Sequence, residues 1–158
     1  MPDFFAHCLV GLVAACSLSG GWTTYVMAIA LSTLPDLDAF TPMHRACLHS
    51  LLVLTPISTL SWLVLRWAKR PTSEALMMPL LPHIHVLMDS VTGGIPVKLL
   101  YPLSDQGFQA SPILDSVVRI LISASPYSYY LEAVRVDLVL LMTSLILIAI
   151  PRLSRYAR

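Results

Sequence analysis

The sequence contains few charged residues. Charged side chains make up 12% of the 158 residues and hydrophobic ones 56%, with a mean hydropathy of +0.74, whereas a soluble domain has about 25% charged residues. Such a chain cannot cover its outside with polar groups, so we expect membrane lipid to cover much of it. The net charge of +1 provides no basic field, which excludes nucleic acid as a partner.

Several motifs that would define other classes of protein are also missing. No HExxH motif is present, which counts against a classical zinc protease. Cys8, Cys16 and Cys47 lack the CxxC spacing of a cysteine zinc site. The N-terminus has no positively charged segment and no small-residue cleavage site, so we expect a retained first helix rather than a signal peptide.

Long apolar runs separated by Gly and Pro predict the fold class. We expect an all-α integral membrane protein, a single domain over residues 1–158 with about five transmembrane helices. The predicted spans are residues 4–18, 22–34, 48–67, 76–91 and 134–150. Residues 110–125 carry apolar side chains at helical spacing, which predicts one amphipathic helix on the membrane surface.

Basic residues follow the third and the last predicted span and suggest an orientation. They are Arg66, Lys69 and Arg70, and then Arg152, Arg155 and Arg158. Because Lys and Arg gather on the cytoplasmic side, we expect a cell (inner) membrane protein with a cytoplasmic C-terminus. Counting five spans then places the histidines on the extracytoplasmic face.

Histidines and aspartates gather toward that face, and ionisable groups within a membrane protein are by default functional. His85 and Asp89 are four residues apart and share one helical face. Asp36 and Asp38 are two apart, so both carboxylates would reach one centre from an extended segment, although they are equally typical of a helix cap or Asx turn. We assign His83 to packing or to a position next to the ligands, because only His85 pairs with Asp89.

These residues fall into motifs that closely resemble the YdjM-like family of membrane-bound metal-dependent hydrolases. The motifs are Ala6-His7, Leu34-Pro35-Asp36-Leu37-Asp38, His44-Arg45-x-x-x-His49-Ser50 and His85-x-x-x-Asp89-x-x-Thr92, all within residues 1–105. The resemblance implies a metal site among His7, Asp36, Asp38, His44, His49, His85 and Asp89. The pattern is also similar to zinc-dependent phospholipase C, which implies a phosphoester substrate.

The predicted function is therefore a metal-dependent hydrolase at the membrane–water interface, acting on a lipid or lipid-like phosphoester. Zinc is the expected ion, with manganese as the alternative, and seven candidate ligands favour two ions over one. Asp36 or Asp38 would bridge the ions or act as base, and Arg45 would hold the developing negative charge. The alternatives are hydrolysis of a membrane-proximal peptide bond, a metal transporter or sensor, and a non-catalytic membrane structural protein.

Overall fold

The computed structural model describes residues 4–18, 20–41, 45–92, 94–122 and 131–156, and these residues are helical apart from loops and one bridged pair, Val97 and Phe108. The elements in chain order are α1 (Phe4–Leu18), α2 (Trp22–Thr33), the 3-10 helix η1 (Leu34–Phe40), α3 (Leu51–Trp67), α4 (Thr72–Met77), the 3-10 helix η2 (Met78–Leu80), α5 (Leu81–Thr92), α6 (Ser111–Ile122) and α7 (Leu131–Tyr156).

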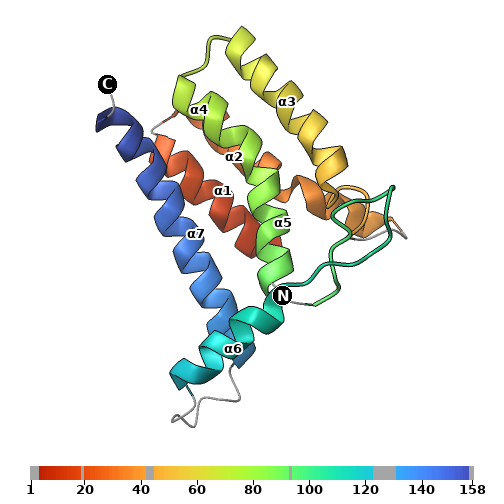
Figure 1. The fold of residues 1–158 in the computed structure, drawn as a ribbon. Coiled ribbons are helices and arrows are strands. Elements are labelled where there is room, and N and C mark those ends of the chain that lie inside the picture. Colours follow the sequence, from red (N-terminus) through yellow and green to blue (C-terminus); the bar gives the residue numbers. More distant parts are fainter. Residues whose placement is uncertain (1–3, 19, 42–44, 93, 123–130, 157–158) are drawn as a thin grey trace.

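The helices α1, α2, α5 and α7 form the body of the molecule (Figure 1). α1 packs along α2 and also contacts α7, while α5 contacts both α2 and α7. α6 lies across the ends of α5 and α7, and α3 stands on the other side of α5. η1 follows α2 directly and contacts α5, so it brings its aspartates to the helix that carries His85 and Asp89.

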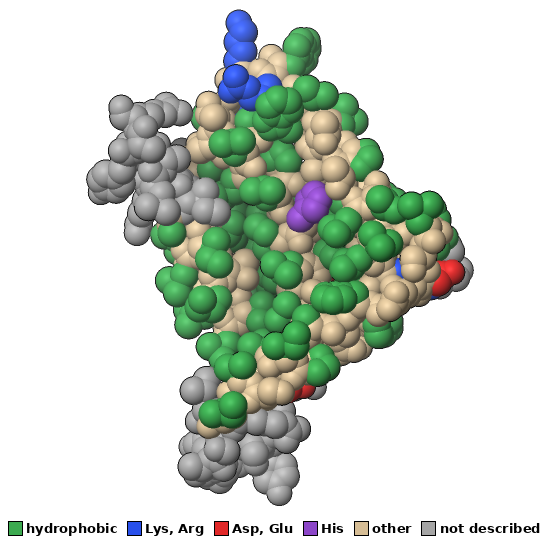
Figure 2. Space-filling view, viewed as in Figure 1, with side chains coloured by type: hydrophobic (Ala, Val, Ile, Leu, Met, Phe, Trp, Pro, Cys, Tyr) green, Lys and Arg blue, Asp and Glu red, His purple; other side chains and the backbone are tan. Residues whose placement is uncertain are grey.

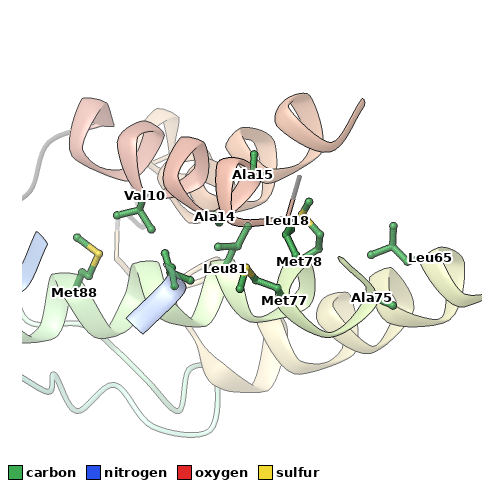
Figure 3. Close-up of a cluster of buried hydrophobic side chains, with 12 residues drawn as sticks. Val10, Ala14, Ala15, Leu18, Leu65, Ala75, Met77, Met78, Leu81 and Met88 are labelled. Atoms are coloured by element: carbon green, nitrogen blue, oxygen red, sulfur yellow. The ribbon is translucent and has the colours of Figure 1, made fainter. Parts of the chain in front are cut away.

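The core lies where α1 packs onto η2 and α5. Figure 3 shows Val10, Ala14 and Leu18 of α1 facing Met78 and Leu81, and all five side chains are buried. The larger apolar side chains of this cluster fill the space between the elements.

Gly11 permits a still closer contact between α1 and α2. A Cβ atom at this position would lie 2.8 Å from the Ala28 carbonyl oxygen and 2.9 Å from Cα of Ile29. Backbone cannot yield as a flexible side chain does, so a larger residue would push the two helices apart. This contact sets the position of His7, one helical turn before Gly11.

The loop between α5 and α6 forms hydrogen bonds at the start of α3 and at the end of α5. Ser50 caps α3 by accepting a hydrogen bond from the Leu52 amide at 3.2 Å, and its hydroxyl donates to the Tyr101 carbonyl at 2.6 Å. The Ala110 amide donates to the Ser90 carbonyl at 2.7 Å. The loop is therefore held against the start of α3 and the end of α5.

The prediction of about five transmembrane helices is wrong. Within the described part of the chain, no helix combines the length and the apolar character that a membrane crossing requires. α1, α2, α3 and α5 have 15, 12, 17 and 12 residues, which at about 1.5 Å per residue fall short of the roughly 30 Å hydrocarbon core. The predicted extracytoplasmic location of the site depends on a count of five spans, so it loses that support.

Candidate metal centre

Four parts of the chain bring histidine and aspartate side chains to one buried cluster. His7 comes from α1, Asp36 from η1, His49 from the residues just before α3, and His85 and Asp89 from α5. The four residues other than Asp36 are at most 3% exposed. The Asp36 side chain is 22% exposed, so the cluster meets its surroundings on the η1 side.

His85 presents one particular nitrogen to the cluster. Its Nδ1 lies 2.7 Å from the Ser32 carbonyl oxygen, so Nδ1 carries the proton and donates it. Its Nε2 lies 3.5 Å from Oδ1 of Asp36 and 3.9 Å from Oδ2 of Asp89. This nitrogen is buried without a hydrogen-bond partner among the described residues, an arrangement typical of a metal ligand.

His49 lies between two carboxylates. Its Nδ1 is 2.9 Å from Oδ2 of Asp38, and its Nε2 is 3.3 Å from Oδ2 of Asp89. The carboxylate of Asp38 therefore orients the ring and leaves Nε2 toward the cluster, the usual role of an outer carboxylate beside a metal-binding histidine.

His7 stacks on His85, with 3.5 Å between ring centroids and 19° between ring planes. Its Nε2 lies 3.2 Å from Oδ1 of Asp89, whereas His49 contacts Oδ2. His7 and His49 thus contact different oxygens of the same carboxylate.

Two sets of ligand atoms could each hold an ion, namely His7, His85 and Asp89, and Asp36, His49 and His85. Because Nδ1 of His85 donates to Ser32, only Nε2 is available, and one nitrogen serves one ion. Metal–ligand bonds of about 2.05 Å imply about 3.3 Å between ligand atoms of a tetrahedral site. The distances from His49 to Asp89 (3.3 Å), from His85 to Asp36 (3.5 Å) and from His85 to Asp89 (3.9 Å) lie at or somewhat above that value. The two sets therefore compete for the same nitrogen of His85.

The charges of the cluster also suit a divalent cation. Asp36, Asp38 and Asp89 supply three carboxylates, and Arg45 is the one guanidinium that contacts them among the described residues. With neutral imidazoles, these groups carry an excess of two negative charges, and charge that is largely buried requires compensation.

Burial, hydrogen bonds and neighbouring charges together set the pKa values of these groups. Burial alone raises the pKa of Asp89, but hydrogen bonds from His49 and His7 and the positive charge of Arg45 outweigh it and lower the pKa. Burial also raises the pKa of Asp36, but its contact with His85 outweighs burial and lowers the pKa. Burial lowers the pKa of His85 and keeps its ring neutral, whereas Asp38 and Asp89 overcome burial and raise the pKa of His49.

The sequence-predicted site residues separate into distinct groups. Asp36 and Asp38 do not converge from an extended segment, because they lie on the 3-10 helix η1 and face different histidines. His44 lies outside the described residues. His83 lies apart from the cluster, with Nδ1 3.3 Å from the Pro79 carbonyl oxygen and 3.4 Å from the Ser58 hydroxyl.

Arg45 is 1% exposed and directs its guanidinium at Asp89 and at a carbonyl of the chain. The sequence-based reasoning missed the carbonyl oxygens of Ser32 and Ile95, which accept from His85 and Arg45. Backbone acceptors leave no signal in side-chain identity, so no motif could have revealed them.

Comparison with known proteins places the chain in one family. No curated protein and no solved structure matches it significantly. The sequence model of a family described as YdjM inner membrane protein matches residues 3–156, which is nearly the whole chain. The chain therefore belongs to the YdjM inner membrane protein family.

Proposed function

We propose that this protein is a metal-dependent hydrolase with one divalent ion held by Asp36, His49, His85 and Asp89. The observation that carries the proposal is the buried cluster in which Nε2 of His85 has no hydrogen-bond partner among the described residues, while carboxylate oxygens lie 3.5 and 3.9 Å away. Two imidazoles and two carboxylates form a donor set that suits zinc, with manganese as the alternative.

When bound, a divalent ion would lower the pKa of a water molecule and polarise a phosphoryl oxygen. Asp38 holds His49 in the tautomer whose Nε2 can donate its lone pair, and the Ser32 carbonyl does the same for His85. Asp36 is the partly exposed member of the set, so we expect substrate and water to approach there. Its Oδ2 has no hydrogen-bond partner among the described residues and can accept a proton from an incoming water.

A lipid or lipid-like phosphoester is the substrate class that we propose. Figure 2 shows hydrophobic side chains over most of the face in view, and large ones such as Phe5, Trp22, Trp67 and Leu103 are 77–87% exposed. A family of inner membrane proteins with such a surface meets lipids more readily than soluble substrates. An amide substrate is the second choice.

The test begins with the metal content of the purified protein, measured by inductively coupled plasma mass spectrometry. We expect about one equivalent of zinc or manganese in the wild type and loss of this metal in His85→Ala and Asp89→Asn, with helical content retained by circular dichroism. The metal-loaded wild type should release phosphate or a phosphorylated headgroup from lipid phosphoesters. Bound metal without activity on any phosphoester or amide would contradict the hydrolase.

The burial of the cluster favours a second candidate, a structural metal site. Structural zinc sites are closed, whereas catalytic ones keep an open position. Cobalt-substituted protein separates the two, because azide or inorganic phosphate should change the visible spectrum of an open site and leave that of a closed site unchanged.

The location of the C-terminus in the cytoplasm stays a prediction, supported by Arg152, Arg155 and Arg158 at the end of the chain. A C-terminal green fluorescent protein fusion should then fluoresce at the inner membrane. A C-terminal alkaline phosphatase fusion that is active instead would place this end outside.

A further inference from the structure

Arg45 lies in the connection between η1 and α3 and is buried to 1% exposure. Its backbone adopts φ +62°, a left-handed conformation that residues other than glycine seldom adopt. Such conformations persist where surrounding contacts hold them, and they gather at functional sites. The left-handed conformation of Arg45 therefore indicates a functional role for the contacts that hold it.

Both the backbone and the side chain of Arg45 contact the cluster. Its amide donates to Oδ1 of Asp38 at 3.3 Å, and its Nη2 lies 2.9 Å from Oδ2 of Asp89. Its Nη1 donates to the Ile95 carbonyl at 2.6 Å, and its own carbonyl accepts from the Lys98 amide at 3.0 Å. One residue thereby connects η1, α5 and the loop that follows α5.

These contacts close a ring around His49. Asp38 contacts Nδ1 of His49, Asp89 contacts Nε2, and Arg45 contacts both of these carboxylates. Fixing both carboxylates fixes the plane of the imidazole between them. The guanidinium also offsets the charge of Asp89 in a buried setting, with Nη2 on the carboxylate and Nη1 on the Ile95 carbonyl.

We propose that Arg45 is a positioning residue that holds Asp89 and His49 in their metal-binding arrangement, in place of the predicted clamp on a substrate anion. The inference rests on the proposed function only in requiring that the cluster binds a metal. It predicts that changes at Arg45 act on metal affinity and ligand geometry, whether or not a substrate is present.

The test is titration of metal-free protein with cobalt(II) alone, followed by visible absorption. Arg45→Met should weaken cobalt binding about 10- to 100-fold, as loss of an outer-shell partner does, and should alter the absorption spectrum. Arg45→Lys should recover part of the affinity, because an ammonium keeps the charge but cannot reproduce the fork. Arg66→Met is the matched control, since Arg66 lies in the last turn of α3 and contacts Thr72, and it should bind cobalt as the wild type does.

Wild-type cobalt affinity and spectrum in folded Arg45→Met, together with loss of the spectral change caused by inorganic phosphate, would overturn the inference and restore the anion clamp. If Arg45→Met does not fold, Arg45→Lys decides, because wild-type affinity in that variant would also contradict positioning by two contacts. If the wild type binds metal but hydrolyses no substrate, the proposed hydrolase activity is wrong, while the positioning role of Arg45 is unaffected. A wild type that binds no metal overturns both.

Discussion

The division of work between Asp38 and Asp89 depends on which nitrogen of His49 each carboxylate meets. Asp38 contacts Nδ1 and Asp89 contacts Nε2, so the two acids have unequal roles. Asp38 orients the ring from behind, whereas Asp89 shares with His49 the space in which an ion would sit. This distinction is invisible in the sequence, where both residues are acids within candidate motifs.

Replacing Asp38 tests the orienting role. Asp38→Asn keeps the shape of the side chain but removes the charge that stabilises the Nδ1–H tautomer of His49. We expect the affinity for zinc, measured by competition with a chromophoric chelator, to fall about 10- to 100-fold with the stoichiometry unchanged. Asp105→Asn is the control, because Asp105 is 78% exposed in its pair with Lys98. Complete loss of metal in Asp38→Asn would instead make Asp38 a ligand.

The raised pKa of His49 predicts how metal binding depends on pH. Without metal, the raised pKa stabilises the folded state at low pH, and this contribution is lost as pH rises through the folded-state pKa. Metal requires the neutral ring, so metal binding must displace this proton and weakens as pH falls. Because the pKa is raised, the weakening should start at a higher pH than an ordinary histidine would give.

Calorimetric titration with zinc in buffers of different ionisation enthalpy measures the protons released. Release should increase as pH falls toward the raised pKa of His49. Asp38→Asn should lower that pKa, since its charge is one of the causes of the shift, and should move the pH dependence downward. An unmoved pH dependence in this variant would rule out His49 as the group responsible.

At the scale of elements, the sequence predicted the outer bounds of helices better than their interruptions. The run 4–18 coincides with α1, because Gly20 and Gly21 follow it. The sequence predicts one span over residues 76–91, but the structure divides this run among α4, η2 and α5. Pro79 lacks an amide hydrogen and interrupts helical hydrogen bonding there, an effect that a count of apolar residues does not register.

The contact between α1 and α2 gives a prediction for Gly11. Gly11→Val should lower the free energy of unfolding by about 1–3 kcal/mol, because the added atoms would meet backbone of α2. It should also weaken metal binding by moving His7 away from Asp89. Chemical denaturation and cobalt titration measure the two effects. Gly21→Ala is the control, since a Cβ there meets nothing within 4 Å, and unchanged stability in Gly11→Val would contradict the close packing.

At the scale of the whole molecule, the site joins residues that are distant in the chain, with His7 and Asp89 separated by 82 positions. The sequence indicated that these residues belong together, because their types and motifs point to one chemistry. It could not show which nitrogen of His85 faces the cluster, because that depends on the placement of the Ser32 carbonyl. Tertiary packing, rather than any local pattern, decides such features.

A second buried polar cluster lies toward the opposite end of α2 from the metal centre. Glu74 is 3% exposed, accepts a hydrogen bond from the Thr24 hydroxyl at 3.0 Å and contacts Nε of Arg70 at 2.8 Å. Thr24 lies in the first turn of α2, whereas Ser32, which accepts from His85, lies in the last. The two clusters share no residue, so we expect changes in them to act independently.

Glu74→Gln tests this independence. Loss of the carboxylate leaves the Arg70 guanidinium without its ionic partner in the pair, and we expect the free energy of unfolding to fall by about 1–3 kcal/mol. Zinc affinity should remain that of the wild type, because His49, His85 and Asp89 keep all their contacts. Asp89→Asn should instead abolish zinc binding at the metal centre. A fall in zinc affinity in Glu74→Gln that matches its loss of stability would show that the metal centre senses the stability of the whole bundle, since every element that supplies a ligand is held by that bundle.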